Sequence, residues 1–469
     1  MQSNSDSKPE YSELTRPETQ AHAPFYLGLD IGTGKVAAVI LDSALESRAV
    51  KSIPHDAVCP APQGRALQDP EVLLETVWSA VRALPANARS RIAAIGVTGQ
   101  MHGVALFSEE MKALTPLVTW QDRRVLENNY LELLVEKAGH PLYSGQGAAT
   151  LAWFRDHGQW PDPVHAAATI QDAAVALLTG ASKPVTDPTD AAGWGLYCLE
   201  SAEWDVEAWE RIGVPRSILP RILACGSKAG SLCPELAGRL GLGAGTPVAA
   251  ALGDHQASLV AVVRSESEDL ALNIGTGAQL SAVVTHASFE APPASFEWRP
   301  YLGNRRVATA AALCGGSAWV WLAESVESWL IELGLEPPPR EKLFQRLNEL
   351  GLDAVSELDL SPHFLGERHD PGLRGGIRGI GMDNFRLGSL SRSLARAIMA
   401  NLKSMMPGEV LHGRRHLLGS GNALRRNPLL QKMAEGVFGL PLRLSSRQEE
   451  AACGAAINAM TLIRSGNRR

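Results

Sequence analysis

The sequence predicts an α/β protein that contains two related domains. One eight-residue motif occurs twice, as LGLDIGTG at 27–34 and as LALNIGTG at 270–277, and the two copies agree at six positions. Each copy has the pattern of an apolar strand that runs into a tight Gly-Thr-Gly turn. A chain of 469 residues also exceeds the usual size of a single hydrophobic core. The simplest interpretation is a duplication in which each domain presents one turn to a shared site.

Strands and helices are expected to alternate along the first part of the chain. Residues 26–42 have the pattern of two strands around the first Gly-Thr-Gly turn. Asp69 and Pro70 then predict the start of a helix, as its N-cap and its first helical residue. A strand at 92–97 leads into the polar loop 98–103. Loops at such strand ends are where α/β proteins bind ligands.

A Gly/Pro-rich segment near the middle of the chain, 241–247, predicts the domain boundary. The N-terminal domain then covers residues 25–245 and the C-terminal domain covers 246–469. Residues 1–24 are polar and lack the apolar stretch of a secretory signal, which indicates a disordered leader.

The C-terminal part has the order strand, Gly-rich loop, helix. The strand is expected at 416–418, the loop at 418–423 and the helix from Asn427 onward. Such a loop can seat a nucleoside. The Ala-rich segment 449–456 is expected to be helical, with small side chains that allow close packing or close approach of a ligand.

Composition excludes several classes of function. The net charge is −6, and basic and acidic residues are mixed along the chain, so nucleic acid is not expected as a partner. The six cysteines form no CxxC pair, which argues against a zinc site or a disulfide framework and favours a reducing, cytoplasmic compartment. No run of about 18 apolar residues occurs, so no membrane span is expected.

Two features point to phosphate chemistry. A Gly-Thr-Gly turn lets backbone N–H groups and a hydroxyl surround an anion, although a single copy could equally be a plain hairpin turn. Asp254 follows an apolar strand and stands 16 residues before the second copy of the motif. A carboxylate there can accept the proton of an attacking hydroxyl or hold Mg²⁺, and the alternative is a helix N-cap.

Two further segments suit a polyhydroxylated ligand. The loop 100–102 presents the Gln100 amide and the His102 imidazole, and the alternative for His102 is a structural role. Residues 120–124 (WQDRR) combine an aromatic ring, a carboxylate and two cations, which could also be a solvated turn with a packed Trp.

Together these motifs resemble the FGGY carbohydrate kinases, and the resemblance covers residues 25–465. The motifs occur in the order seen in that family: 27–34, 99–103 (GQMHG), 253–254 (GD), 270–277, 365–369 (LGERH) with 374–376 (RGG), and 419–421 (GSG). The resemblance implies two ribonuclease-H-like domains of the actin and chaperone-ATPase type, with a cleft between them. Sugar is expected against the N-terminal domain and ATP, with Mg²⁺, against the C-terminal domain. A homodimer is compatible with it.

The resemblance also implies roles for individual residues. Asp254 corresponds to the base that takes the proton from the sugar hydroxyl, and Asp30, with Asp254, to the carboxylates at the Mg²⁺ ion. The remaining correspondences are Gly32, Thr33, Gly34, Lys35, Gly275 and Thr276 at the phosphates, Gln100, Met101, His102 and Asp122 at the sugar, and Gly419, Ser420, Gly421, Asn422 and Asn427 at the adenosine.

The first motif departs from the family pattern. The family usually carries Lys or Arg four residues after the motif's Thr, where this chain has Ala37, with Lys35 two residues earlier. Lys35 is therefore expected to replace that cation from another angle, or the reaction is slower.

Details of the motifs look most like the branch of the family that phosphorylates sedoheptulose at its terminal hydroxyl. The alternatives are a pentulose kinase of the xylulose type, a non-catalytic sugar sensor suggested by Ala37, and an ATPase of the actin or chaperone type. The last has no reason to carry the motif GQMHG.

Overall fold

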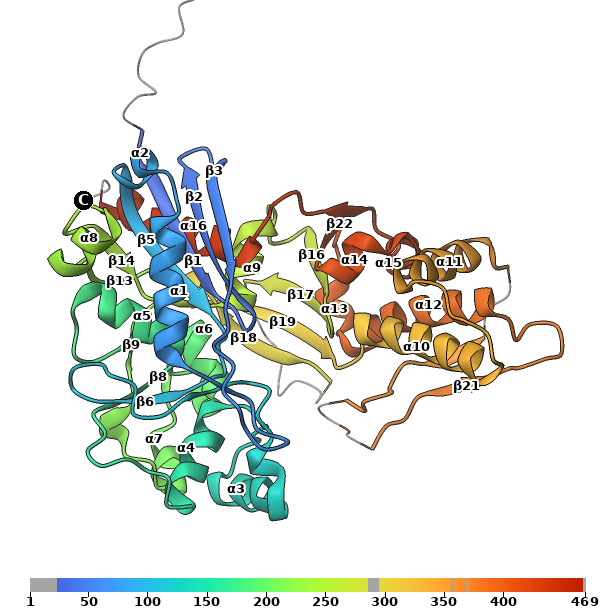
Figure 1. The fold of residues 1–469 in the computed structure, drawn as a ribbon, viewed down its shortest axis with the longest axis horizontal. Coiled ribbons are helices and arrows are strands. Elements are labelled where there is room, and N and C mark those ends of the chain that lie inside the picture. The colour runs from blue at the N-terminus through green and yellow to red at the C-terminus, as the bar shows by residue number, and fades with distance from the viewer. Residues whose placement is uncertain (1–22, 286–294, 356–357, 368–369, 371, 467–469) are drawn as a thin grey trace, which may run out of the picture.

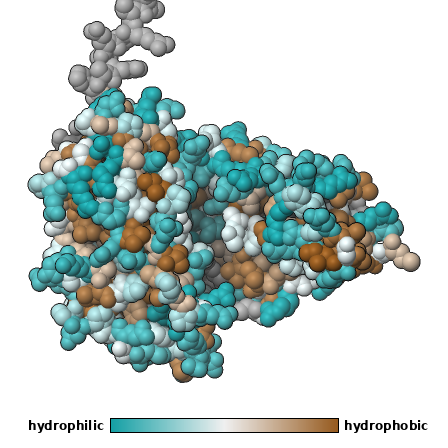
Figure 2. All heavy atoms as spheres, viewed as in Figure 1, coloured by the Kyte–Doolittle hydropathy of each residue, from teal (hydrophilic) through white to brown (hydrophobic). Residues whose placement is uncertain are grey.

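The computed structural model contains two lobes, each built around a β-sheet (Figure 1). A space-filling view shows the surface deeply hollowed between the lobes (Figure 2). Residues 1–22 of the predicted leader, and Arg368 and His369 of the predicted motif 365–369, lie outside the described residues. The structure describes residues 23–285, 295–355, 358–367, 370 and 372–466.

The first lobe holds a seven-stranded sheet. Its strand order is β13-β14-β5-β1-β2-β3, and β15 pairs with the end of β5. β1 runs antiparallel to β2 and parallel to β5. The strands are β1 (Phe25–Ile31), β2 (Lys35–Asp42), β3 (Ser47–Pro54), β5 (Ile92–Gly99), β13 (Lys228–Ser231), β14 (Pro247–Ala249) and β15 (Leu252–Gly253).

The second lobe holds a six-stranded sheet with the order β18-β19-β17-β16-β22-β23. Here β16 runs antiparallel to β17 and parallel to β22. The strands are β16 (Asp269–Ile274), β17 (Ala278–Val284), β18 (Glu297–Tyr301), β19 (Arg305–Ala312), β22 (His416–Ser420) and β23 (Leu442–Leu444).

The two sheets share one internal plan, which confirms the predicted duplication. In each, the strand of the repeated motif pairs antiparallel with the strand after its Gly-Thr-Gly turn and parallel with a later strand. The two turns therefore occupy equivalent hairpins, β1–β2 and β16–β17.

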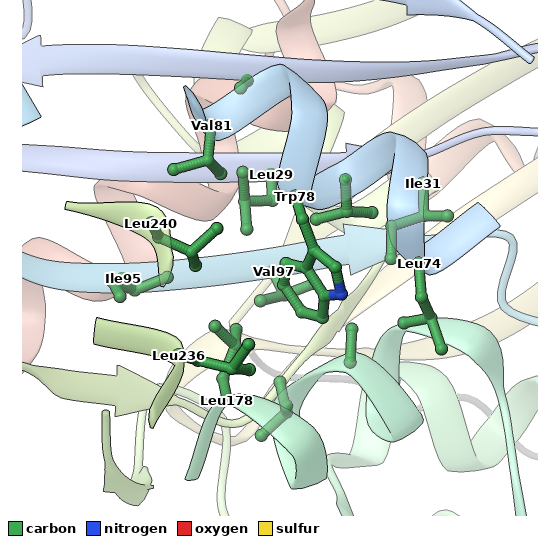
Figure 3. Close-up of a cluster of buried hydrophobic side chains, with 14 of the residues drawn as sticks. Leu29, Ile31, Leu74, Trp78, Val81, Ile95, Val97, Leu178, Leu236 and Leu240 are labelled. Carbon is green, nitrogen blue, oxygen red and sulfur yellow. The ribbon is translucent and has the colours of Figure 1, made fainter. Parts of the chain in front are cut away.

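The core of the first lobe lies between its sheet and a layer of helices that includes α1 (Pro70–Arg82). Trp78 of α1 points at Leu29, Val97 and their neighbours, and Leu178, Leu236 and Leu240 close the cluster from two other helices (Figure 3). Asp69 caps α1 by accepting the N–H groups of Glu71 and Val72, as the sequence predicts.

The other helices and short strands complete the lobes. In the first lobe they are α2 (Ala86–Arg89), α3 (Tyr130–Ala138), α4 (Gly147–Asp156), α5 (Ile170–Thr179), α6 (Pro188–Ala191), α7 (Val206–Ile212), α8 (Pro234–Leu240), β4 (Leu67–Gln68), β6 (Ala105–Phe107), β7 (Leu117–Val118), β8 (Ala166–Ala168), β9 (Val185–Thr186), β10 (Tyr197–Cys198), β11 (Glu203–Trp204) and β12 (Arg221–Ile222). In the second they are α10 (Gly316–Glu332), α11 (Arg340–Asp353), α12 (Leu387–Met405), α13 (Gly408–Leu411), α14 (Asn422–Arg426), α15 (Pro428–Phe438), β20 (Asp359–Ser361) and β21 (Gly376–Arg378).

The Ala-rich helix α16 (Glu450–Gly466) packs on the first sheet, although it follows the second lobe in sequence (Figure 1). The approach is backbone to backbone. A Cβ at Gly28 would lie 1.9 Å from Ala452 O, and one at Gly96 would lie 1.9 Å from Ala455 O. Of the two roles predicted for the Ala-rich segment, close packing is the one that the structure has.

The predicted domain boundary at 245/246 is wrong. It falls in the connection between β13 and β14, two strands that pair antiparallel within the first sheet. The first lobe continues through β15 and into α9 (Asp254–Val262), which packs with α16, and α16 returns to the first lobe. The Gly-rich segment 241–247 is a surface turn that ends α8, because glycine suits loops within a domain as well as between domains. No helix within the described residues is long and apolar enough to cross a bilayer.

Candidate active site

The two Gly-Thr-Gly turns are closed by different backbone hydrogen bonds, but each has open space at one of its glycines. Gly32 N–H donates to Lys35 O at 3.0 Å, and Gly275 N–H donates to Gly277 O at 3.0 Å. A Cβ added at Gly34 or at Gly275 would meet nothing within 4 Å. Each turn thus presents glycine backbone to an open volume, which is the geometry of an anion cradle.

A third turn joins the second one. Gly421, between β22 and α14, has a φ of 87°, and a Cβ there would lie 2.4 Å from Ile274 O, just before the second Gly-Thr-Gly turn. Gly419 and Ser420 end β22, which lies beside β16, and Asn422 begins α14. The predicted adenosine loop and the second phosphate turn are therefore adjacent.

Asn427 has a structural role as well. Its side-chain oxygen caps α15 by accepting the Leu430 N–H at 2.8 Å, and its buried Nδ2 has no hydrogen-bond partner within the described residues. The amide nitrogen is the part of Asn427 that remains for a ligand.

The start of α10 lies beside these turns, although no residue of α10 was among the predicted site residues. Gly316 N–H donates to Gly275 O at 2.9 Å, and Ser317 N–H donates to Thr276 O at 3.0 Å. The positive end of a 17-residue helix thus lies against the second turn. The sequence signal for it is the pair Gly315-Gly316, separated by two residues from the end of the apolar strand β19. This is the same strand, glycine, helix order that marked the adenosine loop.

The carboxylates of Asp254, predicted to be the base, and Asp30, predicted to lie at the metal, are at neighbouring strand ends in the first lobe. Asp30 is opposite Thr98 in the β1–β5 pairing, and Gly253, before Asp254, is opposite Gly99 in the β5–β15 pairing. Asp254 is the first residue of α9, and Gly253 is the N-cap. The Asp254 Oδ1 accepts the N–H of His255 at 2.7 Å, so the N-cap alternative does not hold.

Burial raises the pKa of both groups, and neighbouring negative charges add to the shift at Asp30. Burial, the charge of Asp254 and the charge of Glu449 raise the pKa of Asp30 to about 8, and Lys35 opposes the shift. Burial raises the pKa of Asp254 to about 6, against the His255 hydrogen bond and the charge of Arg299. Perturbed carboxyl groups at strand ends are characteristic of active sites.

Two networks hold Asp254 in place, one from each lobe. From the first lobe, Gly253 N–H donates to Thr189 Oγ1 at 2.9 Å, and Thr189 Oγ1 donates to Asp187 Oδ1 at 2.6 Å. All of these atoms are buried, so the backbone before Asp254 is fixed. No local signal in the sequence marks this role for Thr189.

From the second lobe, the guanidinium of Arg299 on β18 donates to His255 Nδ1 at 3.2 Å. Because Nδ1 accepts, the proton lies on Nε2, which is 2.9 Å from Ser281 Oγ. Burial and Arg299 lower the pKa of His255 to about 3, so the ring is neutral. The start of α9 is therefore tied to strands of both lobes.

The loop after β5 places Gln100, Met101 and His102 on the same side as Asp254. The Met101 sulfur lies 3.2 Å from a Cβ built on Gly253, and His102 Nδ1 donates to Gly193 O at 2.8 Å. Gln100 Nε2 donates to Gln68 Oε1 at 2.7 Å, while its buried Oε1 has no hydrogen-bond partner within the described residues. That oxygen is an open acceptor for a ligand hydroxyl.

The loop is coupled to the first phosphate turn. Gln68 Nε2 donates to Thr33 O at 2.7 Å, and Trp120 Nε1 donates to Thr33 Oγ1 at 3.1 Å. Trp120 is also 46% exposed, so part of its ring stays accessible beside this turn. The segment 120–124 is therefore more than the solvated turn considered above.

Asp122 points the other way, which departs from its expected place at the sugar. Its buried carboxylate accepts the Arg124 side chain at 2.8 and 2.9 Å, together with the N–H groups of Ala66 and Arg124. All of its strong acceptor positions are used, so the structure gives Asp122 a structural role. In sequence the two uses look identical, because a carboxylate in a polar segment fits either one.

Lys35, expected at the phosphates, has its side chain paired with Glu449 rather than placed over the first Gly-Thr-Gly turn. Its Nζ lies 2.6 and 2.8 Å from the two carboxylate oxygens of Glu449, just before α16. Ala37, where the family pattern has a cation, is buried in the cluster between β2 and α16.

The described residues fit a divalent ion shared with a nucleotide better than an all-protein metal site. Among them, no group of three or more His, Cys, Asp or Glu side chains is placed to hold a metal. The buried Asp30 Oδ1 has no hydrogen-bond partner, and open space lies above both glycine turns. Mg²⁺ commonly binds through one or two carboxylates plus phosphate oxygens and water, which these groups can supply.

Comparison with known proteins gives one consistent result. Residues 25–261 match the N-terminal domain of the FGGY family of carbohydrate kinases. Sedoheptulokinase from Mus musculus is 31% identical over 93% of this chain and 97% of its own length. Xylulose kinase from Staphylococcus xylosus is 21% identical over 93% and 90%. Among solved structures, gluconate kinase from Lactobacillus acidophilus superposes with a TM-score of 0.81 at 21% identity, over 94% of this chain and 90% of that one. The chain is therefore a sugar kinase and belongs to the FGGY family of carbohydrate kinases.

Proposed function

We propose that this sugar kinase transfers the γ-phosphate of ATP to the terminal hydroxyl of sedoheptulose, with Mg²⁺ as the metal. The choice of sugar rests on the similarity to sedoheptulokinase, which is 31% identical over nearly the full length of both chains. The matched xylulose kinase is only 21% identical. The carboxylates Asp30 and Asp254, which lie at neighbouring strand ends, support the reaction.

In this proposal the ketose lies against the first lobe. The Gln100 Oε1 accepts a sugar hydroxyl, His102 and Trp120 line the same side, and the terminal hydroxyl points to Asp254. Asp254, whose pKa is about 6, is ionised at neutral pH and takes the hydroxyl proton as that oxygen attacks phosphorus.

ATP lies against the second lobe. The backbone of the turns at Thr33 and Thr276 surrounds the phosphates, the start of α10 places its positive end beside them, and the loop 419–422 holds the adenosine. A bound Mg²⁺ neutralises phosphate charge during transfer, and Asp30, with Asp254, would hold it. Positioning and charge neutralisation supply most of the catalysis in phosphoryl transfer.

Substitution of Asp254 tests the reaction. Asp254→Asn keeps the shape and removes the base, so we expect kcat to fall at least ~100-fold while calorimetric binding of the sugar stays within about twofold of the unsubstituted protein. Asp359→Asn, at the exposed first position of β20 in the second lobe, is the matched control and should have no effect. Unchanged turnover in Asp254→Asn would remove Asp254 from this role.

A ketose panel tests the substrate. We expect kcat/KM to be highest for sedoheptulose among sedoheptulose, D-xylulose and D-ribulose, because a polar pocket discriminates strongly by hydroxyl pattern. The motif GQMHG is the feature that favours a pentulose instead. A preference of roughly tenfold for xylulose would overturn the sedoheptulose assignment and leave the kinase assignment intact.

A further inference from the structure

The ion pair between Lys35 and Glu449 joins the first phosphate turn to the segment that returns from the second lobe. Lys35 is the first residue after that turn, and Glu449 comes 414 residues later. Figure 1 shows the segment before α16 in red, running from the second lobe back to the first sheet. The pair therefore lies where the two lobes are connected.

The side chain of Glu449 is held more firmly than that of Lys35. Glu449 has a φ of 54°, which is left-handed for a non-glycine residue, and its carbonyl accepts the Cys453 N–H at the start of α16. Neighbouring residues also hold the segment, since Arg447 donates to Leu45 O at 2.9 Å and Arg425 pairs with Glu450. The Glu449 side chain is 15% exposed, whereas that of Lys35 is 51% exposed. A fixed carboxylate thus holds a movable ammonium.

The pair also affects the titration of Asp30, the carboxylate proposed to lie at the Mg²⁺ ion. The charges of Lys35 and Glu449 shift the pKa of Asp30 in opposite directions, so both lie within electrostatic range of it. With Ala37 buried under α16, Lys35 is the cation that this motif offers to a phosphate. A half-exposed ion pair is weak, and a triphosphate carries more negative charge than one carboxylate.

We propose that Glu449 is a positioning residue that holds Lys35 beside the first phosphate turn and yields it to the terminal phosphate when ATP binds. This inference rests on the proposed function. Glu449 then competes with the nucleotide for one ammonium group, and the cation missing at position 37 is replaced by a lysine with a second, internal partner.

Binding of nucleotides without turnover tests this competition. Calorimetry would use a non-hydrolysable ATP analogue and ADP, each with Mg²⁺, on the full chain. Lys35→Met should weaken binding of the analogue ~10-fold and that of ADP by less than about twofold, because only the triphosphate reaches the ammonium. Glu449→Gln should tighten binding of the analogue several-fold, because Lys35 is released from its competitor.

The double variant Lys35→Met/Glu449→Gln tests whether the two residues act through each other. In the Lys35→Met background, Glu449→Gln should no longer affect analogue binding, which is the coupling expected of two groups that act through each other. Glu349→Gln, which breaks the exposed pair with Arg346 on α11, is the control for a general change of charge. Thermal unfolding of each variant checks that the fold is intact.

Three results would overturn the proposal: weaker analogue binding in Glu449→Gln, an equal effect of Glu449→Gln with and without Lys35, or equal losses for triphosphate and diphosphate in Lys35→Met. If Glu449→Gln does not fold, the triphosphate-to-diphosphate comparison in Lys35→Met still decides. The kinase assignment is judged separately, by turnover of the unsubstituted protein. If the protein turns over ATP but the effect of Glu449→Gln does not depend on Lys35, only the proposal about Glu449 fails. If the two variants are coupled but the protein shows no turnover, only the kinase assignment fails.

Discussion

The hydroxyl of Thr189 accepts the backbone N–H of Gly253 at 2.9 Å, one residue before Asp254. Thr189 donates in turn to the buried Asp187. The hydroxyl thus fixes the direction in which β15 delivers Asp254, without itself lying among the groups proposed to touch the sugar.

Loss of this hydroxyl should slow catalysis more than it weakens binding. We expect Thr189→Val to lower kcat ~10- to 100-fold, because a small misplacement of a reacting group is costly, with sugar affinity changed less than about twofold. Thr189→Ser keeps the hydroxyl and should stay near the unsubstituted rate. Steady-state kinetics and calorimetry measure the two quantities. Equal rates for the Val and Ser variants would contradict the positioning role.

The pH dependence of kcat/KM should report Asp254. Because the pKa of Asp254 is raised to about 6 and the base acts in its ionised form, kcat/KM at saturating Mg²⁺ should fall about tenfold per pH unit below pH 6 and level off above it. An ordinary Asp would keep the rate constant down to about pH 4. A profile that is flat to pH 5 would speak against burial of the base.

Binding of Mg²⁺ should displace a proton. The pKa of Asp30 is raised to about 8 without metal, so its carboxyl is mostly protonated at pH 7 and must ionise to face a cation. Affinity for Mg²⁺ with ADP should therefore rise with pH up to about 8. Calorimetry in two buffers of different ionisation enthalpy measures the proton release, which Asp30→Asn should abolish. The same release in Asp30→Asn would place the proton elsewhere.

Removal of the Asp122 carboxylate should damage the fold rather than sugar binding. Asp122→Ala leaves the buried guanidinium of Arg124 without a partner, which costs ~3–5 kcal/mol and should lower the unfolding temperature by about 10 °C. Glu127→Ala is the control, because it breaks the ion pair with Arg65, in which the Glu127 side chain is exposed. Thermal unfolding and the sugar KM separate the two roles. A raised KM at an unchanged unfolding temperature would return Asp122 to the sugar site.

A methyl group at Gly316 should affect the nucleotide alone. Its Cβ would lie 2.4 Å from Gly275 O and 2.8 Å from the Cβ of Ala423, so it would push the second turn and the adenosine loop apart. We expect Gly316→Ala to raise the KM for ATP at least ~10-fold, with the sugar KM unchanged. Gly436→Ala, which has open space on α15, is the matched control. Equal effects on both substrates would mean a general loss of structure.

The fold was predictable because its signals are local and repeated. The two Gly-Thr-Gly copies gave the duplication, and Asp69-Pro70 gave the start of α1, since capping and turn chemistry act over a few residues. The domain boundary failed because a returning helix cannot be read from local composition. Nothing near Ala452 in sequence says that it lies against Gly28.

The candidate site was predictable to the extent that its residues lie in motifs. Asp30, Asp254 and the turns stand at strand ends, where α/β proteins place their chemistry. Arg299 and Thr189 were missed because their roles depend on partners far away in sequence. Asp122 and Lys35 show the opposite difficulty, since their residue types fit a ligand and their contacts are made within the protein.

The packing of α16 has a consequence for the order of assembly. One face of the first sheet, including Gly28 and Gly96, is covered by a helix whose residues are synthesised after the whole second lobe. The first lobe cannot finish folding as an independent unit during synthesis, and its alanine-lined face stays exposed to water until then. Chains interrupted before residue 450 would carry an uncovered apolar sheet, the kind of surface by which incomplete chains associate and by which chaperones select them.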